Sequence, residues 1–167
     1  MKTYDLTLPL STADIAKLNR TDKVLLTGCL YTARDATHKR IVNILQKGEK
    51  LPFSLADVAL FYCGPSPIRP GNICGAIGPT TSARMDIYTP FLLQNGLKVM
   101  IGKGDRSPEV QKAITEYGAV YFIMPGGISA YLSQHIVSCE TYLWQDLGPE
   151  AIYKLWVKDI PVYVHSK

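Results

Sequence analysis

Short apolar runs, each ending in a polar or glycine-rich turn, set the organisation of this sequence. These runs occupy residues 24–32, 56–63, 99–102 and 119–124. Helical patterns follow at residues 34–47, 81–94 and 108–117. Because strands that alternate with helices are typical of parallel or mixed sheets, the sequence predicts an α/β domain with a mixed, partly parallel sheet.

Glycine and proline mark the ends of the predicted elements. Gly48, Gly96 and Gly118 follow the three helical patterns, where helices commonly end. The segment 64–71 is too rich in proline and glycine for regular structure, and long loops in compact domains are often functional. For residues 150–164 we expect a short helix that leads into a strand, because β-branched and aromatic residues gather towards its end.

The composition indicates one compact domain, residues 1–167, with 47% hydrophobic and 19% charged residues. The net charge of +4 is spread without a basic run, so we expect no nucleic-acid partner and a mild attraction for small anions. No window approaches the roughly 20 apolar residues of a membrane span, and the charged N-terminal segment lacks the apolar core of a signal peptide. A cytoplasmic location without membrane contact is therefore expected.

The cysteines and two of the histidines give no sign of a metal site. None of the four cysteines lies in a C-x-x-C pair or in the tight spacings of zinc ribbons and ferredoxins. We expect them to be buried or neutral thiols in a reducing compartment. His135 and His165 lie in segments without companion ligands.

A candidate anion site lies in residues 75–86. The hydroxyls of Thr80, Thr81 and Ser82 suit the N-cap of a helix that follows. Free backbone N–H groups and the positive end of the helix dipole would stabilise a carboxylate or phosphate there. Arg84, about one turn after Thr80, is placed to bind a carboxylate through two parallel hydrogen bonds. The alternative is an ordinary cap followed by a solvated arginine.

Two more cations come directly after predicted strands. Arg34 follows the run 24–32, and Lys103 follows the run 99–102. In an open α/β sheet the carboxyl ends of the strands share the edge at which ligands bind. Two arginines, a lysine and a helix N-terminus at that edge would suit a substrate with two carboxylates. The alternative is a set of charged residues at strand ends with no ligand.

Three further polar residues carry a weaker signal. Asp35 and His38 follow Arg34 closely. His38 is a candidate acid or base, against the alternative of a solvated or locally hydrogen-bonded histidine on a helix surface. Asp86 is expected to complement the first turn of its helix. No P-loop, nucleophile elbow or complete dinucleotide fingerprint is present, so the residues alone predict an anion-binding α/β domain.

Several segments resemble the β subunit, or C-terminal domain, of class I fumarases and L-tartrate dehydratases. The most specific is Gly78 to Asp86, GPTTSARMD, together with Ile101 to Gly104, IGKG. Weaker matches are ARDATH (33–38), YCGPSP (62–67), LGPEAI (147–152) and VKDIP (157–161). These blocks keep the order of the family and span nearly the whole chain, although Cys63 stands where a small residue is expected.

The resemblance implies a single swivelling β/β/α domain that docks against a larger α subunit. In that family the α subunit holds a four-iron iron-sulfur cluster through cysteines and leaves one iron open as a Lewis acid. The cofactor is thus expected on the partner, with no metal bound by this chain. A homodimer of β subunits within an α2β2 assembly is also implied.

The implied function is the reversible hydration of fumarate to malate, a step of the tricarboxylic acid cycle, with activity only when the α subunit is present. By position, Arg34, Arg84 and Lys103 match contacts to the substrate carboxylates, and Thr80 matches a threonine that assists proton transfer. A threonine hydroxyl is a weak base and needs help from a neighbouring charge or from the partner subunit. The alternatives are an L-tartrate dehydratase β subunit, a stand-alone dicarboxylate-binding module, and a structural assembly subunit, which the intact set of four residues disfavours.

Overall fold

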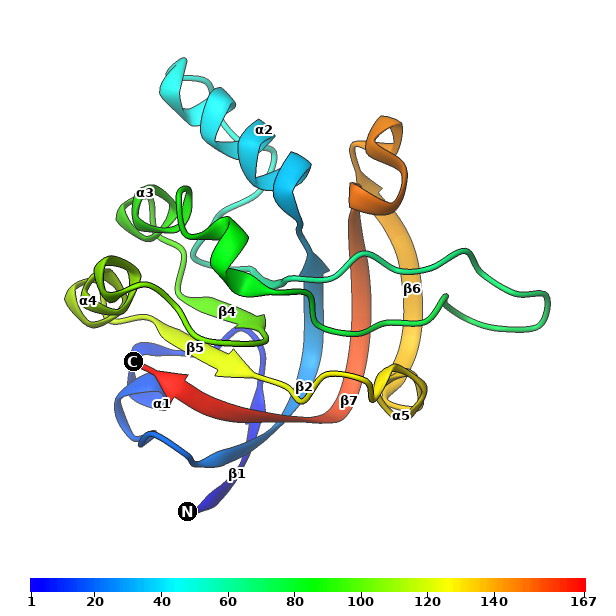
Figure 1. Ribbon diagram of the computed structural model, residues 1–167, viewed down its shortest axis with the longest axis horizontal. Coiled ribbons are helices and arrows are strands. Elements are labelled where there is room, and N and C mark those ends of the chain that lie inside the picture. The colour runs from blue at the N-terminus through cyan, green and yellow to red at the C-terminus, as the bar shows by residue number, and fades with distance from the viewer.

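The computed structural model describes residues 1–167, which form one seven-stranded sheet with helices packed along it (Figure 1). The strands are β1 (Thr3–Thr7), β2 (Lys23–Thr32), β3 (Ala59–Phe61), β4 (Val99–Gly102), β5 (Val120–Ile123), β6 (Ile136–Leu143) and β7 (Ile152–Ser166). The helices are α1 (Thr12–Ala16), α2 (Asp35–Gln46), α3 (Thr89–Gln94), α4 (Pro108–Glu116) and α5 (Ser129–Ser133), with two 3-10 helices, η1 (Ser82–Met85) and η2 (Gln145–Glu150).

The pairings of the strands close the sheet into a ring. β1, β2, β3, β4 and β5 are parallel neighbours in that order. β7 runs antiparallel and pairs with both β5 and β2, while β6 lies beside β7. The predicted mixed, partly parallel sheet is confirmed, but the assumption of an open sheet is wrong because the β2–β7 pairing closes it. The carboxyl ends of β2, β3 and β4 nevertheless share one edge.

Side chains of the central strands alternate between two hydrophobic cores. Leu60 and Met100 lie in a core shared with the helices, while Phe61 and Ile101, one residue further along, lie in the core inside the ring. Helices α2, α3 and α4 cover the outer side of these strands (Figure 1). Since both faces of each short strand are buried, the strands read as continuous apolar runs in the sequence.

All four predicted strands are present as β2, β3, β4 and β5, and the helical patterns at 34–47 and 108–117 are α2 and α4. The predicted helix at 81–94 is instead divided into η1 and α3. Pro90 has no N–H to donate to the carbonyl of Asp86, so the α-helical ladder cannot run through this point. The hydroxyl of Thr89 donates to the carbonyl of Met85 at 2.8 Å and closes the turn.

The prediction of a short helix from residue 150 is also wrong, because the helical structure, η2, ends at Glu150. From Ile152 to Ser166 the chain forms β7, a continuous strand. Tyr153 and Leu155 pair with β6 on one side, and Leu155 pairs with Leu30 of β2 on the other. Neighbours distant in the sequence therefore decide the structure of this segment.

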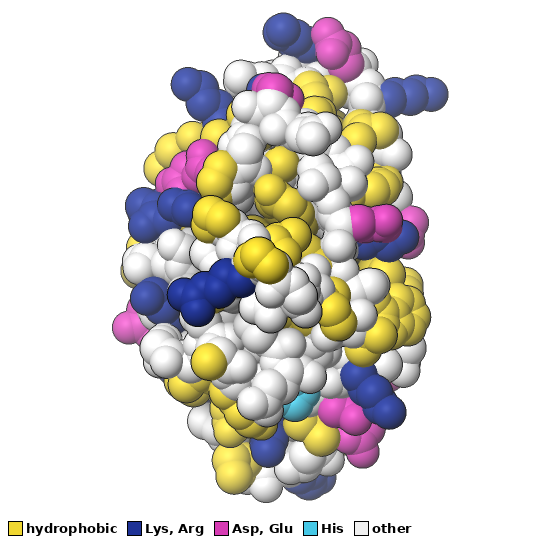
Figure 2. Space-filling model, turned by 90° about the vertical axis from the view of Figure 1, so that its right-hand side faces the viewer, with side chains coloured by type: hydrophobic (Ala, Val, Ile, Leu, Met, Phe, Trp, Pro, Cys, Tyr) yellow, Lys and Arg dark blue, Asp and Glu magenta, His cyan; other side chains and the backbone are white.

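None of the helices is both long enough and apolar enough to cross a membrane. Figure 2 shows the face from which the loop between β3 and η1 projects. Basic and acidic side chains are interspersed there with apolar ones, and no continuous positive patch forms on this face.

Candidate functional site

The loop of residues 64–80 leaves β3, extends away from the domain and returns over the end of the same strand (Figure 1). The N–H of Thr80 donates to the carbonyl of Tyr62 at 2.7 Å, and the N–H of Ala33 donates to that of Phe61 at 2.9 Å. These bonds, with the parallel bridge between Thr81 and Lys103, bring the residues after β2, β3 and β4 to one edge of the sheet. Arg34, Thr80 and Lys103 therefore lie on the edge predicted for them.

Arg84 contacts Thr80, which lies four residues before it, and Asp35, which is distant in the sequence. Its Nη2 donates to the hydroxyl of Thr80 at 2.9 Å, and its Nε donates to Oδ1 of Asp35 at 3.1 Å. Partial burial opposes ionisation of Asp35, but hydrogen bonds from Arg84 and the charge of Arg34 lower its pKa overall. Asp35 thus holds the guanidinium of Arg84 beside the Thr80 hydroxyl, while 46% of the Arg84 side chain stays exposed.

Lys103 is fixed through its backbone and leaves its ammonium group free. Its N–H donates to Oγ of Ser82 at 3.1 Å, and its carbonyl accepts from the N–H of Ser82 at 3.1 Å. The ammonium group lies beside the turn at Gly126, where a Cβ placed on the glycine would be 3.6 Å from Nζ of Lys103, an ordinary contact distance. The half-buried lysine makes no ion pair within this chain.

Arg34 lies in a narrow gap between two loops. A Cβ on Gly64 would lie only 2.8 Å from Cδ of Arg34 and 3.0 Å from the carbonyl oxygen of Pro149, so only glycine leaves room for the side chain. Nε of Arg34 is 3.5 Å from a carboxylate oxygen of Glu150. This ion pair lacks hydrogen-bond geometry, and the buried Nε–H has no hydrogen-bond acceptor. The arginine is therefore held in place without being fully paired.

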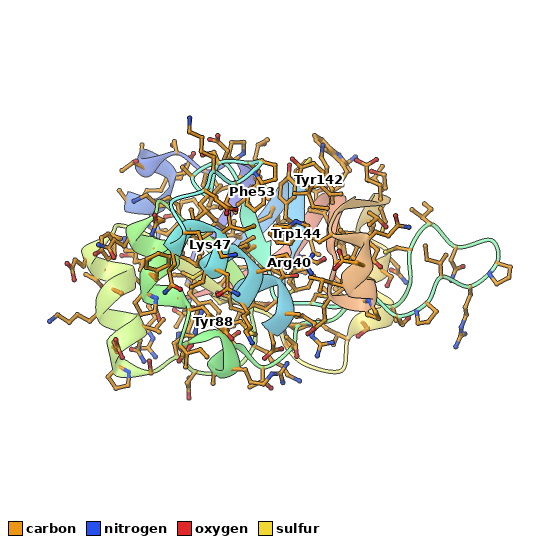
Figure 3. All side chains as sticks on the ribbon, turned by 90° about the horizontal axis from the view of Figure 1, so that it is seen from above. Arg40, Lys47, Phe53, Tyr88, Tyr142 and Trp144 are labelled. Atoms are coloured by element: carbon orange, nitrogen blue, oxygen red, sulfur yellow. The ribbon has the colours of Figure 1, made fainter.

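Glu150 is positioned by the packing of η2 on α2. Arg40 donates to both carboxylate oxygens of Asp146, at 2.9 and 2.6 Å, and its guanidinium lies over the ring of Trp144 at 5.4 Å. Figure 3 shows Arg40 of α2 beside Trp144. The hydroxyl of Thr37 also donates to the backbone carbonyl of Glu150. These contacts hold the segment that carries Glu150 against the start of α2.

A buried polar network lies beneath η1. Nε of Arg106 donates to Asp86 at 2.6 Å, and its guanidinium lies over the rings of Tyr62 and Tyr121, 5.3 and 4.8 Å from the ring centroids. The hydroxyl of Tyr121 donates to the backbone carbonyl of Gly104 at 2.8 Å and accepts a hydrogen bond from Oγ of Ser82 at 2.8 Å. Burial raises the pKa of Tyr121 to about 12, so Tyr121 stays neutral and keeps its proton for the bond to Gly104.

Several details of the predicted anion site are wrong. Thr81 is the N-cap of η1 but its hydroxyl caps nothing, and η1 has four residues. A single 3-10 turn provides no aligned α-helical dipole, so the site rests on side-chain cations instead. Asp86 lies at the end of η1 and pairs with Arg106, so it does not complement the first turn of the helix predicted for residues 81–94.

His38, expected on a helix surface, is fully buried. Burial, opposed by the hydrogen bond that its Nδ1–H donates to the carbonyl of Arg34 at 2.8 Å, lowers its pKa to about 4. The imidazole is thus a neutral packing residue beneath the site, and Nε2 has no partner.

Sequence reasoning missed the supporting roles of Arg106, Tyr121 and Glu150. Each acts on a residue remote in the sequence, and no local pattern marks such a contact. The match of LGPEAI to the family was the only signal available for Glu150.

The side chains of this chain do not fit a metal cluster. No group of three or more His, Cys, Asp or Glu side chains is arranged to hold a metal ion. Cys74 and Cys139 lie together, but neither Cys63 nor Cys29 completes a ligand set with them.

Comparison with known proteins places the chain in a family. Residues 1–166 match the family model described as Fumarase C-terminus. A protein of Methanocaldococcus jannaschii, named provisionally as an L(+)-tartrate dehydratase subunit beta, is 37% identical over 90% of this chain and 80% of its own length. The L(+)-tartrate dehydratase subunit beta of Shigella sonnei is 30% identical over 92% of this chain and 77% of its own length.

The anaerobic class I fumarate hydratase of Escherichia coli is 32% identical over 91% of this chain, but the match covers only 28% of that enzyme. The relatives named here are hydro-lyases, and the similarity to them extends along nearly all of the sequence. Because the family model also matches nearly every residue, this chain belongs to the Fumarase C-terminus family.

Proposed function

We propose that this chain is the β subunit of a heteromeric hydro-lyase and that it supplies substrate contacts for the reversible hydration of fumarate to malate. Membership of the family supports the reaction class. The observation that carries the proposal is the hydrogen bond from Arg84 to Thr80, made at an edge that also presents Arg34 and Lys103. A dicarboxylate requires two cationic contacts at once, and this edge offers three.

Arg84 and Lys103 would bind the two carboxylates of the substrate, and the hydroxyl of Thr80 would transfer a proton. Arg84 uses three donors, from Nε and Nη2, in hydrogen bonds to Asp35 and Thr80, and its Nη1 remains for a carboxylate. The ammonium of Lys103 is free for the second carboxylate. Holding both ends of the substrate removes most of its orientational freedom, which lowers the barrier to elimination or addition of water.

Thr80 has the neighbouring charge that a weak acid or base needs. Because its oxygen accepts a hydrogen bond from the Arg84 guanidinium, negative charge that develops on that oxygen is stabilised. In the proposal the hydroxyl passes its proton between the substrate and a group of the partner subunit. The α subunit is proposed to carry the four-iron cluster, since this chain lacks the ligands for it.

L-tartrate is the second candidate substrate. The relative with the higher identity, 37%, is named as a tartrate dehydratase β subunit, and the match covers 80% of it. Both substrates are four-carbon dicarboxylates and use the same cationic contacts. Assembly as α2β2 in the cytoplasm belongs to the same proposal.

The test is anaerobic co-expression of this chain with a candidate cluster-bearing α subunit, followed by activity assays with fumarate, malate and tartrate. Turnover that requires both chains is expected. In the complex, Arg84→Ala should lower kcat/KM by at least about 100-fold. Arg20→Ala removes the same charge from an exposed position outside the site and should behave as wild type.

If Arg84→Ala turned over normally, the assignment of the cationic contacts would be wrong. If the chains failed to associate and this chain alone bound dicarboxylates, a stand-alone binding module would replace the half-enzyme.

A further inference from the structure

Two thiols from distant parts of the sequence lie against each other at the base of the 64–80 loop. Sγ of Cys74, in the loop, is 2.7 Å from Sγ of Cys139, in β6. Both cysteines are free thiols. Since bonded sulfurs are about 2.0 Å apart, only a small adjustment of the side chains separates this contact from an S–S bond.

Hydrogen bonds and strand pairing position the backbone beside both thiols. On the loop side, the N–H of Ala76 donates to Oγ of Ser66 at 2.8 Å, and the N–H of Ser66 donates to the carbonyl of Ala76 at 3.1 Å. A Cβ on Gly75 would lie 1.6 Å from the carbonyl oxygen of Ser66, so the two arms of the loop meet at a position that only glycine allows. On the other side, Cys139 pairs with Leu155 of β7.

Cys74, of which 8% is exposed, is the thiol of the pair that faces a cavity. Cys74 lines a cavity of about 570 Å³ between the loop and α5, and Gln134 and Ile136 line its other side. The cavity lies beneath the loop and includes none of Arg34, Thr80, Arg84 and Lys103 in its walls. Cys139 is half-buried.

We propose that Cys74 and Cys139 form a thiol-oxidation site, which a low-molecular-weight disulfide such as oxidised glutathione converts into an intramolecular disulfide. This inference is independent of the proposed function. It needs only two adjacent thiols and a route for the oxidant.

The order of the steps follows from the contact between the thiols. The hydrogen bond between them lowers the pKa of Cys74 and raises that of Cys139, so Cys74 loses its proton first. The Cys74 thiolate attacks the oxidant, breaks its S–S bond, forms a mixed disulfide and releases one small thiolate. Cys139 then gives its proton to solvent and attacks Sγ of Cys74, which releases the second small thiolate. Two protein thiols become one disulfide, and the oxidant is reduced to two thiols.

The other cysteines provide internal controls. Cys63 is buried, and burial raises its pKa to about 12, so it remains a neutral and unreactive thiol. Cys29 lies in β2 and its neighbour across the ladder is Trp156 of β7. Neither thiol has a cysteine within hydrogen-bonding distance.

The experiment treats the reduced full-length chain with oxidised glutathione, blocks the remaining thiols and digests the product with trypsin. Residues 51–84 contain Cys63 and Cys74, and residues 113–154 contain Cys139, so the linked peptides identify the bond. We expect a cross-link between Cys74 and Cys139, located by fragmentation, in wild type, Cys29→Ser and Cys63→Ala. It should disappear in Cys74→Ser and Cys139→Ser.

The disulfide should also raise the midpoint of thermal unfolding by roughly 5–10 °C, because it closes a long loop in the unfolded chain. Addition of dithiothreitol should reverse this shift. Free thiols at both positions in oxidised wild type, a stable glutathione adduct on Cys74, or a cross-link through Cys63 would each overturn the proposal. Because wild type alone decides between these outcomes, the test does not depend on the folding of any variant.

Discussion

Arg106 and Asp86 form a buried ion pair beneath the candidate site, with Nε of the arginine 2.6 Å from Oδ1 of the aspartate and no exposed surface on the Arg106 side chain. The second oxygen of Asp86 accepts the N–H of Ser107 at 2.7 Å. One carboxylate thus joins the end of η1 to the start of α4. Through Tyr121, which contacts both Arg106 and Ser82, the pair supports Ser82 and Lys103 without being part of the candidate site itself.

Loss of this carboxylate should destabilise the fold. Asp86→Asn leaves the buried guanidinium of Arg106 without its counter-charge, which costs about 3–5 kcal/mol in comparable sites. We expect the free energy of unfolding, measured by urea denaturation, to fall by about 3–5 kcal/mol. Asp57→Asn, at an exposed position, is the matched control and should change stability by less than about 0.5 kcal/mol. Equal stability of the two variants would show that Asp86 is not required for the buried charge.

Thr80 should matter for turnover and little for stability. Thr80→Val keeps the branched shape and removes the hydroxyl that accepts from Arg84. If the hydroxyl transfers a proton, kcat in the complex should fall by about 100-fold or more. Thr80→Ser restores a hydroxyl and should recover most of the activity. The proton-transfer role fails if Thr80→Val and Thr80→Ser have the same kcat.

Asp35 is expected to act through Arg84. Asp35→Asn weakens the hydrogen bonds that hold the guanidinium and should raise KM for the dicarboxylate roughly 10-fold. In a double-mutant cycle with Arg84→Gln, the two changes should be non-additive, with a coupling energy of about 0.5–3 kcal/mol. Additive effects would mean that Asp35 supports the site by another route.

Buried His38 should make stability depend on pH. Its pKa is about 4 in the folded protein against 6.5 for an exposed histidine, mainly because of burial. As the pH falls from 6.5 to about 4, the unfolded chain binds a proton that the folded protein does not. Stability should therefore be full above this window and decrease through it by up to about 1.4 kcal/mol per pH unit.

The check for His38 is urea unfolding at a series of pH values for wild type and His38→Gln. The variant lacks the titrating group and should show a shallower slope in the same window, whatever its absolute stability. Parallel curves for the two proteins would locate the titration elsewhere.

The sequence predicts those parts of the fold in which one short segment carries its own signal. β3 and β4 are buried on both faces and therefore appear as apolar runs. β6 has mostly exposed residues and exists because it pairs with β7, so its sequence shows no clear pattern. β1, α1 and α5 are also absent from the elements that the sequence predicts.

In the candidate site, too, the sequence predicts the residues that carry a local signal and misses the contacts between distant segments. Arg34 and Lys103 could be placed because each follows a strand, and the end of a parallel strand has a known position in a sheet. The contact of Arg84 with Asp35 joins two helical segments that are far apart in the sequence. The burial of His38 likewise depends on the rings of Tyr62 and Tyr88, which pack beside it. Such contacts arise only when the tertiary structure forms.

The closure of the sheet by β7 has a consequence for how the protein reaches its native state. Lys23 pairs with Tyr163, and Tyr31 with Lys154, so the longest ladder joins segments from opposite ends of the sequence. A large loss of chain entropy must precede these contacts, which makes folding slow for a domain of this size. Until β7 docks, β2 and β5 both expose unpaired backbone, and intermediates at this stage are open to association with one another. Refolding should therefore succeed best in dilute solution.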